Sequence, residues 1–392
     1  MKNLRRWCAP WLALCALVLA SCGGGGGVDT GGTGGITPAL AAGPITGFGS
    51  VIVGGVRYAD DTAEVEDLDG SRRTRDELKL GMTVEIEAGA INDSAATATA
   101  RRIRFESELT GLVSAVDVAG ESFTVLGQHV VVDAATVFDD RFVHGLASLA
   151  VAQPVEVYAE FDAALQRYRA TRVEPATLES LRSGLLRLRG PVAEVNPLLR
   201  TLRIGTATFR YDRASDVPAG LAAGAWVRLR LAFDPSPVAV WEVQRFSLAL
   251  RDWADADEVR IEGRVSARSG SLFVVNGRTV DGSAAALPAE LVVGARAEVR
   301  GSLRAGVLRA TRVTVRSEAD NSGREFQIEG LVTAIDAAAG TVTLRDLVIS
   351  TRRPGLRVVC GPVSPRLGDR VEVRAVLAVD RRTLEATRIT CR

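Results

Sequence analysis

The chain contains few side chains of the kinds that catalyse reactions or bind metals. His129 and His144 are its only histidines, and no cysteine lies near either of them in the sequence. Since zinc takes three or four nitrogen, sulfur or oxygen ligands, two histidines alone do not make a site. We therefore expect both histidines at the surface, and we predict no metal and no cofactor.

Two acidic stretches offer the oxygen ligands that calcium prefers. Asp67-Leu68-Asp69-Gly70 has closely spaced carboxylates but lacks the third acidic position and the distal glutamate of an EF-hand loop. Because Asp-Gly is a preferred turn pair, we predict a hairpin turn there. The second stretch, for which we expect a solvated linker, consists of Asp252, Asp255, Asp257 and Glu258.

The N-terminus has the layout of a secretory signal. Lys2, Arg5 and Arg6 form a basic region, and the run from Trp7 to Ala20 is apolar apart from Pro10. A membrane-spanning helix needs roughly 20 apolar residues, so this run is too short to span. We predict a signal peptide over residues 1–21.

The end of that signal resembles the processing site of bacterial lipoproteins. Leu19-Ala20-Ser21-Cys22 matches the lipobox at all four positions. The resemblance implies that Cys22 carries lipid and anchors the exported protein to a membrane. Gly23 in place of aspartate favours the outer membrane, at its periplasmic face or at the cell surface. Residues 22–43 are rich in glycine and should form a flexible tether, although Ile36, Leu40 and Ile45 allow its end to pack on the first folded module.

Two cysteines remain in the mature chain, Cys360 and Cys391. Leu356, Val358 and Cys360 share one strand face, and Thr387, Ile389 and Cys391 share another, so the inward faces of two strands could bring the two sulfur atoms together. Export permits a disulfide, which we predict between Cys360 and Cys391. Two buried free thiols are the alternative.

From Gly47 onward the chain repeats itself with a period of about 65 to 80 residues. Each unit opens with a Gly-x-Val-like strand, which begins at Gly47, Gly111, Gly190, Gly263 and Gly330. A turn that ends in glycine then precedes a Val-Glu-Val-like strand, whose glutamates are Glu85, Glu156, Glu298 and Glu372, with Arg228 in the third unit. The closing strand reads Ala-Thr-Arg-Val or a close variant and contains Arg102, Arg172, Arg312 and Arg388. We place the glutamates on a solvent face and the arginines on the wet face of an edge strand.

These units predict an all-β protein of five tandem modules, at residues 44–107, 108–184, 185–256, 257–322 and 323–392. About five short strands with a helical turn before the fourth are typical of an OB-like small barrel, and an open sandwich is the alternative. A domain of this size buries only about 60% of its unfolded surface. We therefore expect beads on a string, each of which is marginally stable alone.

The lipobox, the glycine-rich tether and the recurring landmarks together resemble exported bacterial proteins built from an uncharacterised module, the domain of unknown function 5666 family. The resemblance covers Gly43 to Arg392. It implies a β-rich envelope protein and brings with it no activity, cofactor or site residues.

Composition and repetition narrow the function further. The chain has 48 Lys and Arg against 47 Asp and Glu, so net charge does not favour nucleic acid as a partner. No acidic, histidine or serine position recurs in all five units, which argues against an enzyme. We predict a non-enzymatic binding or spacer protein with a protein or polysaccharide partner in the envelope. A polysaccharide hydrolase with one active module and an assembly factor for a surface structure are the alternatives.

Overall fold

The computed structural model describes residues 38–392, apart from residues 213, 215–216, 220, 235–239, 249–252, 317–323 and 361–364. Cys22, the predicted signal peptide, the tether up to residue 37 and Asp252 lie outside the described residues. Within the described part of the chain, no helix is both long enough and apolar enough to cross a membrane.

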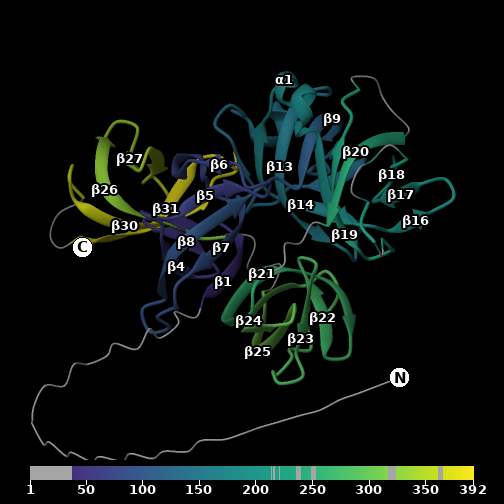
Figure 1. The fold of residues 1–392 in the computed structure, drawn as a ribbon. Coiled ribbons are helices and arrows are strands. Elements are labelled where there is room, and N and C mark those ends of the chain that lie inside the picture. The colour runs from purple at the N-terminus through teal and green to yellow at the C-terminus, as the bar shows by residue number, and fades with distance from the viewer. Residues whose placement is uncertain are drawn as a thin grey trace, which may run out of the picture. The chain divides into compact units, whose positions relative to one another are not determined.

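Two modules make up the N-terminal half of the described chain (Figure 1). The first contains β1 (Ala39–Pro44), β2 (Gly47–Phe48), β3 (Val51–Val53), β4 (Val56–Ala59), β5 (Glu64–Asp67), β6 (Arg72–Arg73), η1 (Arg75–Glu77), β7 (Thr83–Ala88) and β8 (Thr97–Phe105). The second contains β9 (Leu109–Asp117), β10 (Ser122–Val125), β11 (Gln128–Val131), β12 (Val137–Phe138), η2 (Gly145–Ser148), β13 (Pro154–Asp162) and β14 (Arg167–Pro175). The short helices α1 (Leu178–Ser180) and η3 (Leu181–Leu185) follow it.

Three further modules complete the chain. The third contains β15 (Arg187–Pro191), β16 (Glu194–Asn196), β17 (Thr201–Ile204), β18 (Ala207–Arg210), β19 (Trp226–Leu231) and β20 (Val240–Leu248). The fourth contains β21 (Ala256–Ser269), β22 (Leu272–Val275), β23 (Arg278–Asp281), β24 (Arg296–Arg304) and β25 (Val307–Arg316). The fifth contains β26 (Phe326–Asp336), β27 (Thr341–Leu344), β28 (Leu347–Ser350), β29 (Arg357–Val359), β30 (Arg370–Leu377) and β31 (Leu384–Cys391).

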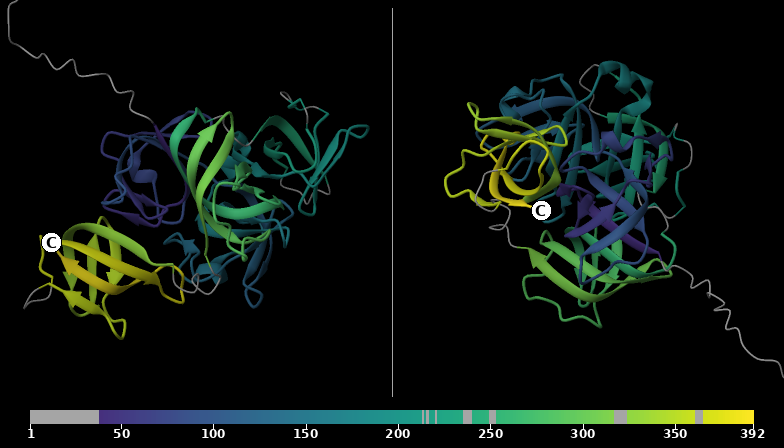
Figure 2. Two further views of the ribbon diagram at one scale, coloured as in Figure 1. Left: turned by 90° about the horizontal axis from the view of Figure 1, so that it is seen from below. Right: turned by 90° about the vertical axis from the view of Figure 1, so that its left-hand side faces the viewer.

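All five modules share one strand order, which closes each sheet into a small barrel. In the second module β9 pairs with β10, β10 with β11, β11 with β14, β14 with β13, and β13 again with β9. The third and fifth strands run parallel in every module, in the pairs β4–β8, β11–β14, β18–β20, β23–β25 and β28–β31. The predicted all-β, OB-like barrel is therefore confirmed, and Figure 2 shows the fifth module in yellow as a sheet that curves round on itself.

The closing strand of each barrel is not an edge strand, so that part of our prediction is wrong, and the predicted solvent exposure of its arginines holds for only some of them. It pairs with the third strand on one side and with the fourth on the other. Arg172 is buried and bonds to Glu174, whereas Arg312 and Arg388 are exposed.

The strand register corrects the predicted start of the first module. The opening glycines lie opposite the first residue of the Val-Glu-Val strand, in the pairs Gly43–Val84, Gly111–Val155, Gly190–Val227, Gly263–Ala297 and Gly330–Val371. The first repeat therefore opens at Gly43 and not at Gly47. Strand β1 begins at Ala39, within the predicted tether of residues 22–43. Its alanines and glycine resemble the tether in composition, which hides the strand from sequence analysis.

The second landmark marks a turn with a left-handed backbone. The φ angles of Gly81, Gly224, Gly294 and Gly368 lie between 83° and 89°. Each of these glycines donates its amide to the opening strand of its own module, as Gly81 does to the carbonyl of Ile45. In the second module Ala152 takes this place with φ of 66°, although a side chain makes such a conformation costly.

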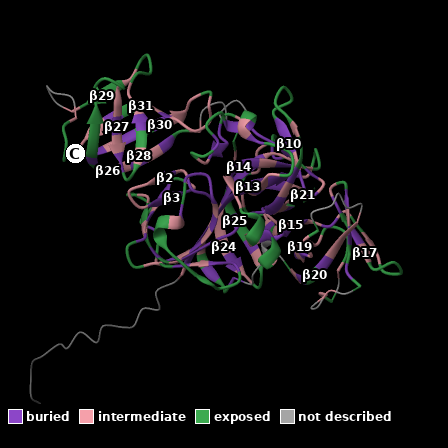
Figure 3. Cartoon of the chain, turned by 90° about the horizontal axis from the view of Figure 1, so that it is seen from above, coloured by how far each residue is buried: buried purple, intermediate pink, exposed green. Residues whose placement is uncertain are grey.

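Alternating residues of the strands build the module cores. In β7 and β19 every second residue is buried. Figure 3 shows buried and intermediate segments along the strands and exposed segments mainly in the loops. Leu40, from the predicted tether, is 4% exposed and packs in the core of the fourth module with Val259 and Ile261. The end of the tether is therefore part of the folded structure.

The first strands of the modules also pair with one another. Strand β1 runs parallel to β21 of the fourth module, and β2 runs parallel to β26 of the fifth (Figure 1). Strand β9 of the second module pairs with β15 of the third. The beginning of a first strand leaves a row of unpaired backbone groups, which proteins normally cover. Here another module covers it, and the expected beads on a string do not describe this arrangement.

Candidate interface centre of the first four modules

The linker between the first and second modules is buried rather than solvated. Glu106, Ser107 and Glu108 separate β8 from β9, and they are 6%, 2% and 5% exposed. Two carboxylates at such depth require compensating charge, because a buried unpaired charge is very costly. The third module supplies it with arginines from β15 and β19.

Glu108 contacts three modules at once. Its backbone amide bonds to the carbonyl of Val157 in the second module, and its carbonyl accepts the amide of Arg189 from the third. Its side chain accepts a hydrogen bond of 2.8 Å from the amide of Ala159 and one of 3.3 Å from the hydroxyl of Thr83 in the first module. Arg189 lies 3.3 Å from the same carboxylate. Burial raises the pKa of Glu108 to about 7, although Arg189 and the amide of Ala159 oppose the rise.

Glu106 is the acceptor for two arginines of the third module. Arg187 and Arg228 both bond to one of its carboxylate oxygens, and these two side chains are 7% and 11% exposed. Arg228 also bonds to Asp69 of the first module at 2.9 Å. Burial alone would lower the pKa of Arg228, but Glu106 and Asp69 raise it. The third module thus binds the linker through Glu106 and the first barrel through Asp69.

The recurring glutamate of the Val-Glu-Val strand binds a neighbouring module in the first and fifth modules, so its predicted solvent-facing role is wrong there. Glu85 accepts bonds of 3.1 Å from Arg278 of the fourth module and from the indole of Trp253. Glu372 of the fifth module accepts one of 3.1 Å from Arg57 of the first. In the third module the equivalent Arg228 binds acidic partners instead.

The remaining two glutamates of this series differ from each other. Glu298 is bonded by Arg300 and Arg316 of its own module. Burial raises the pKa of Glu156, and Arg187 of the third module opposes the rise. The position in the strand therefore does not by itself decide the role of this glutamate.

A second buried carboxylate connects the second and fourth modules. Glu160 is 5% exposed, and the guanidinium nitrogens of Arg264 and Arg296 lie 3.7 Å and 3.9 Å from its oxygens. Burial alone would raise the pKa of Glu160, but the two arginines lower it. The pKa of Glu160 is lowered whereas that of Glu108 is raised, because Glu160 faces more arginines.

These groups surround a cavity of about 50 Å³ at the meeting point of the four modules. Its walls include the carboxylates of Glu85, Glu106, Glu108, Glu160 and Glu262, the guanidinium groups of Arg104, Arg189 and Arg278, and the rings of Phe105, Phe161 and Trp226. A buried glutamate with a raised pKa in a cavity is the usual mark of an acid catalyst. Sites for small-molecule ligands, however, measure about 300 to 1,000 Å³. A cavity of this size has room for a few water molecules but not for a sugar ring.

The structure separates the residues that the sequence suggested for metal binding. His129 on β11 and His144 before η2 are both exposed, as predicted. Asp67 and Gly70 lie at the hairpin of β5 and β6, and Asp67 accepts the amides of Asp69 and Ser71. The predicted turn is confirmed. In the described part of the chain, no group of three or more histidine, cysteine, aspartate or glutamate side chains is arranged to hold a metal.

The second acidic stretch is less solvated than we expect from the sequence. Asp255 accepts the amide of Ala305, and Asp257 forms an ion pair with Arg304. Glu258 accepts the amide of Ile91 from the first module at 3.1 Å. These carboxylates bind protein groups and hold the start of the fourth module.

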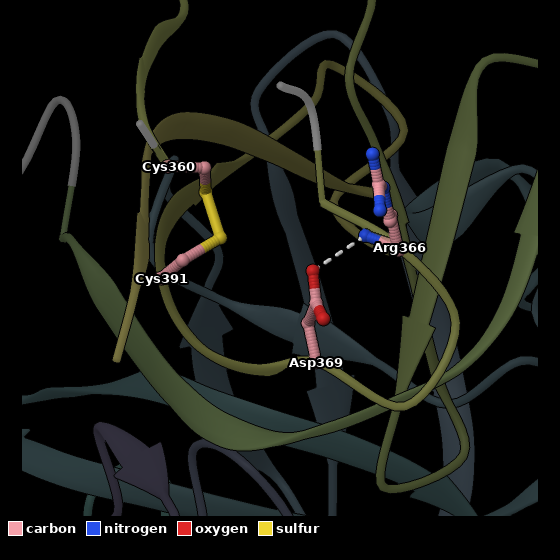
Figure 4. Close-up of a disulfide and its surroundings, with 4 residues drawn as sticks. All are labelled: Cys360, Arg366, Asp369 and Cys391. Carbon is pink, nitrogen blue, oxygen red and sulfur yellow. Dashed lines mark hydrogen bonds between the residues drawn. A yellow bond between two sulfur atoms is a disulfide. The ribbon is translucent and has the colours of Figure 1, made fainter. Parts of the chain in front are cut away.

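Cys360 and Cys391 form the predicted disulfide, with Cα atoms 4.7 Å apart (Figure 4). The face argument for it is only partly right. Ile389 is buried, but Val358 and Val359 on β29 are 45% and 48% exposed. Pairing of β29 with β31 in parallel, Val358 opposite Ile389, is what brings the two cysteines together. The bond fixes β29 to the last strand of the chain.

Sequence analysis did not predict that the linker is buried or that arginines of the third module bind it. Glu106 and Glu108 fall between two repeats, where a solvated linker is the ordinary expectation. A usable signal was the alternation Arg187-Leu188-Arg189 on one strand and Arg228-Leu229-Arg230 on its neighbour. Two adjacent strands with arginines on the outward face predict an acidic partner, although not which one.

Comparison with known proteins identifies the module and no activity. Residues 110–174 and 262–314, within the second and fourth modules, match the family described as Domain of unknown function (DUF5666). The predicted resemblance is confirmed for these two modules. No curated protein matches the chain. A solved structure described as drosophila Unr CSD456 is 15% identical over 52% of this chain and 96% of its own, with a TM-score of 0.14, and we infer nothing from so low a score.

Proposed function

We propose that this chain, which carries repeats of the DUF5666 module, is a non-enzymatic scaffold of the bacterial envelope. In this proposal lipid on Cys22 anchors it to the outer membrane, and the assembled modules present a surface to a protein or polysaccharide partner. The observation that supports a scaffold is the pairing of first strands between modules. Such pairing holds the modules to each other, whereas a passive string needs none.

The buried charges at the junction, where the first four modules meet, support the same proposal. Buried carboxylates are the groups that serve as general acids in hydrolases, but here they are bonded to arginines of neighbouring modules, as Glu106 is to Arg187 and Arg228. The cavity they line is several-fold smaller than a site for a small ligand. These residues are better suited to holding modules together than to hydrolysis.

Crosslinking in intact cells followed by identification of the crosslinked partner tests the proposal. We expect one envelope component to be captured in stoichiometric amounts, and to be lost from the membrane fraction together with the protein when Cys22→Ala is introduced. Release of fragments from peptidoglycan or cell-surface polysaccharide by the purified mature protein would contradict it and favour the hydrolase. Retention of the Cys22→Ala variant in the membrane would contradict the anchor.

A further inference from the structure

The most unusual feature of the junction is that one titratable side chain reaches all three of the first modules. Glu108 belongs to the linker between the first two barrels, its backbone bonds to β13 and β15, and its carboxylate accepts the hydroxyl of Thr83 on β7. A change in the charge of this one group acts on three modules together.

We propose that the protonation state of Glu108 controls this junction. The modules are held together while the Glu108 carboxyl is protonated, and they separate more readily when the carboxylate is charged. The inference concerns how firmly the modules are held, so it does not depend on which partner the scaffold binds. It also gives a use to a buried acid that no catalytic arrangement employs.

The surroundings of Glu108 give the sense of the switch. Burial penalises the charged form and raises the pKa of Glu108 to about 7, against an ordinary value of 4.5. The group is 5% exposed. When the junction opens, water reaches the carboxyl, which then loses its proton more readily. Opening is therefore favoured as the pH rises from about 4.5 to about 7 and changes little above that range.

Other charged and titratable groups around Glu108 do not remove this effect. Arg189 on β15 lowers the pKa of Glu108, but its guanidinium is 3.3 Å away and also lies over the ring of Trp226, at 5.9 Å from the ring centre. Tyr168 on β14 donates its hydroxyl to the carbonyl of Arg189. Further charged groups line the same cavity, namely Glu106, Glu160, Glu85, Arg104, Glu262 and Arg278. Glu106 and Glu160 each have arginine partners of their own.

Trp226 provides a direct readout, because its ring lines the cavity beside Arg189. We suggest acrylamide quenching of tryptophan fluorescence and hydrogen exchange of the Arg189 amide, from pH 5.5 to 8.5, on the full mature chain made soluble by Cys22→Ala. Exchange rates are corrected for the intrinsic effect of pH. The equilibrium constant for opening should rise by about 20-fold between pH 5.5 and 7.5 if one group with these two pKa values is responsible.

Two variants decide whether Glu108 is that group. Glu108→Gln mimics the protonated form and should keep the Arg189 amide protected with no pH dependence across this range. Arg189→Gln removes the nearest positive charge and should move the midpoint of the wild-type transition to higher pH, which keeps the inference testable if the first variant folds poorly. Glu372→Gln, at the contact with the fifth module, should retain the wild-type profile. The same pH profile in wild type and Glu108→Gln, or no change in wild type, would overturn the proposal.

Discussion

The first module meets its neighbours in two ways. Its contact with the second and third modules is made through buried charge: Glu106 of the linker and Arg187 and Arg228 of the third module have side chains that are 2%, 7% and 11% exposed. Its contact with the fifth module is made through a close approach of the backbone and through half-buried charge. Gly47 lies against the carbonyl of Gln327, and Arg57, whose side chain is 22% exposed, bonds to Glu329 and Glu372.

This difference teaches how each contact is kept specific. A buried ion pair gains little net stability, but losing one partner leaves an uncompensated charge. We call the contact of the first module with the second and third modules the first junction, and its contact with the fifth module the second junction. At the first junction, unpaired buried charge therefore disfavours a wrong neighbour. At the second junction a close backbone approach, which only glycine permits, selects the neighbour by shape. The two junctions should respond differently to substitution.

The largest effect is expected at the first junction. Glu106→Gln removes the carboxylate that Arg187 and Arg228 share and leaves Arg228 with Asp69 alone, and we expect it to lower the free energy of unfolding by about 3 to 5 kcal/mol. Urea denaturation followed by circular dichroism measures this loss. The matched control is Glu194→Gln, whose exposed pair with Arg203 should contribute no more than about 1 kcal/mol.

Removal of the disulfide should act on the fifth module alone. The bond joins residues separated by 31 positions, and closing such a loop stabilises by about 3 to 4 kcal/mol in the chain-entropy model. Cys360→Ser should therefore lower the melting transition of the fifth module and leave the first junction unchanged. Calorimetry with and without a reducing agent measures it. Equal loss of protection at Arg189 would show that the two junctions are not independent.

A smaller effect is expected from shape at the second junction. A methyl group on Gly47 would lie 2.1 Å from the carbonyl oxygen of Gln327, so Gly47→Ala must push the fifth module away, at a cost of about 1 to 3 kcal/mol. Faster hydrogen exchange at the Gln327 amide is the expected sign. Gly89→Ala is the control, because its nearest neighbour is 4.0 Å away. If both variants behave alike, the close approach has no role.

The smallest expected effect is an increase in stability. Ala152 has the left-handed backbone conformation that glycine adopts at the equivalent turn of the other modules. Ala152→Gly relieves that strain but makes the unfolded chain more flexible, so we expect a net stabilisation of about 0.5 to 1 kcal/mol. Thermal unfolding measures it. A loss of stability would mean that the alanine side chain contributes packing that outweighs its backbone strain.

Sequence analysis could predict the features that depend only on residues within one module. Alternation, turn glycines and the spacing of Cys360 and Cys391 lead to small closed barrels and a disulfide. It misplaced the start of the first module, since Ala39 to Gly43 is too short and too small in its side chains to stand out from a glycine-rich tether. It also placed Glu85 and Glu372 in solvent. A period of two shows only that a side chain points away from its own core, not that another module supplies an arginine to meet it.

The central claim is that the modules are joined through their first strands. The most direct test measures hydrogen exchange at the amides of Arg189 and Gln327, which donate to Glu108 and Thr46 across module borders at 2.8 Å and 3.0 Å. Below pH 6 both should exchange about as slowly as Val113, whose amide bonds to Gln153 within one barrel. Exchange of both at the rate of free amides, while Val113 remains protected, would contradict the account.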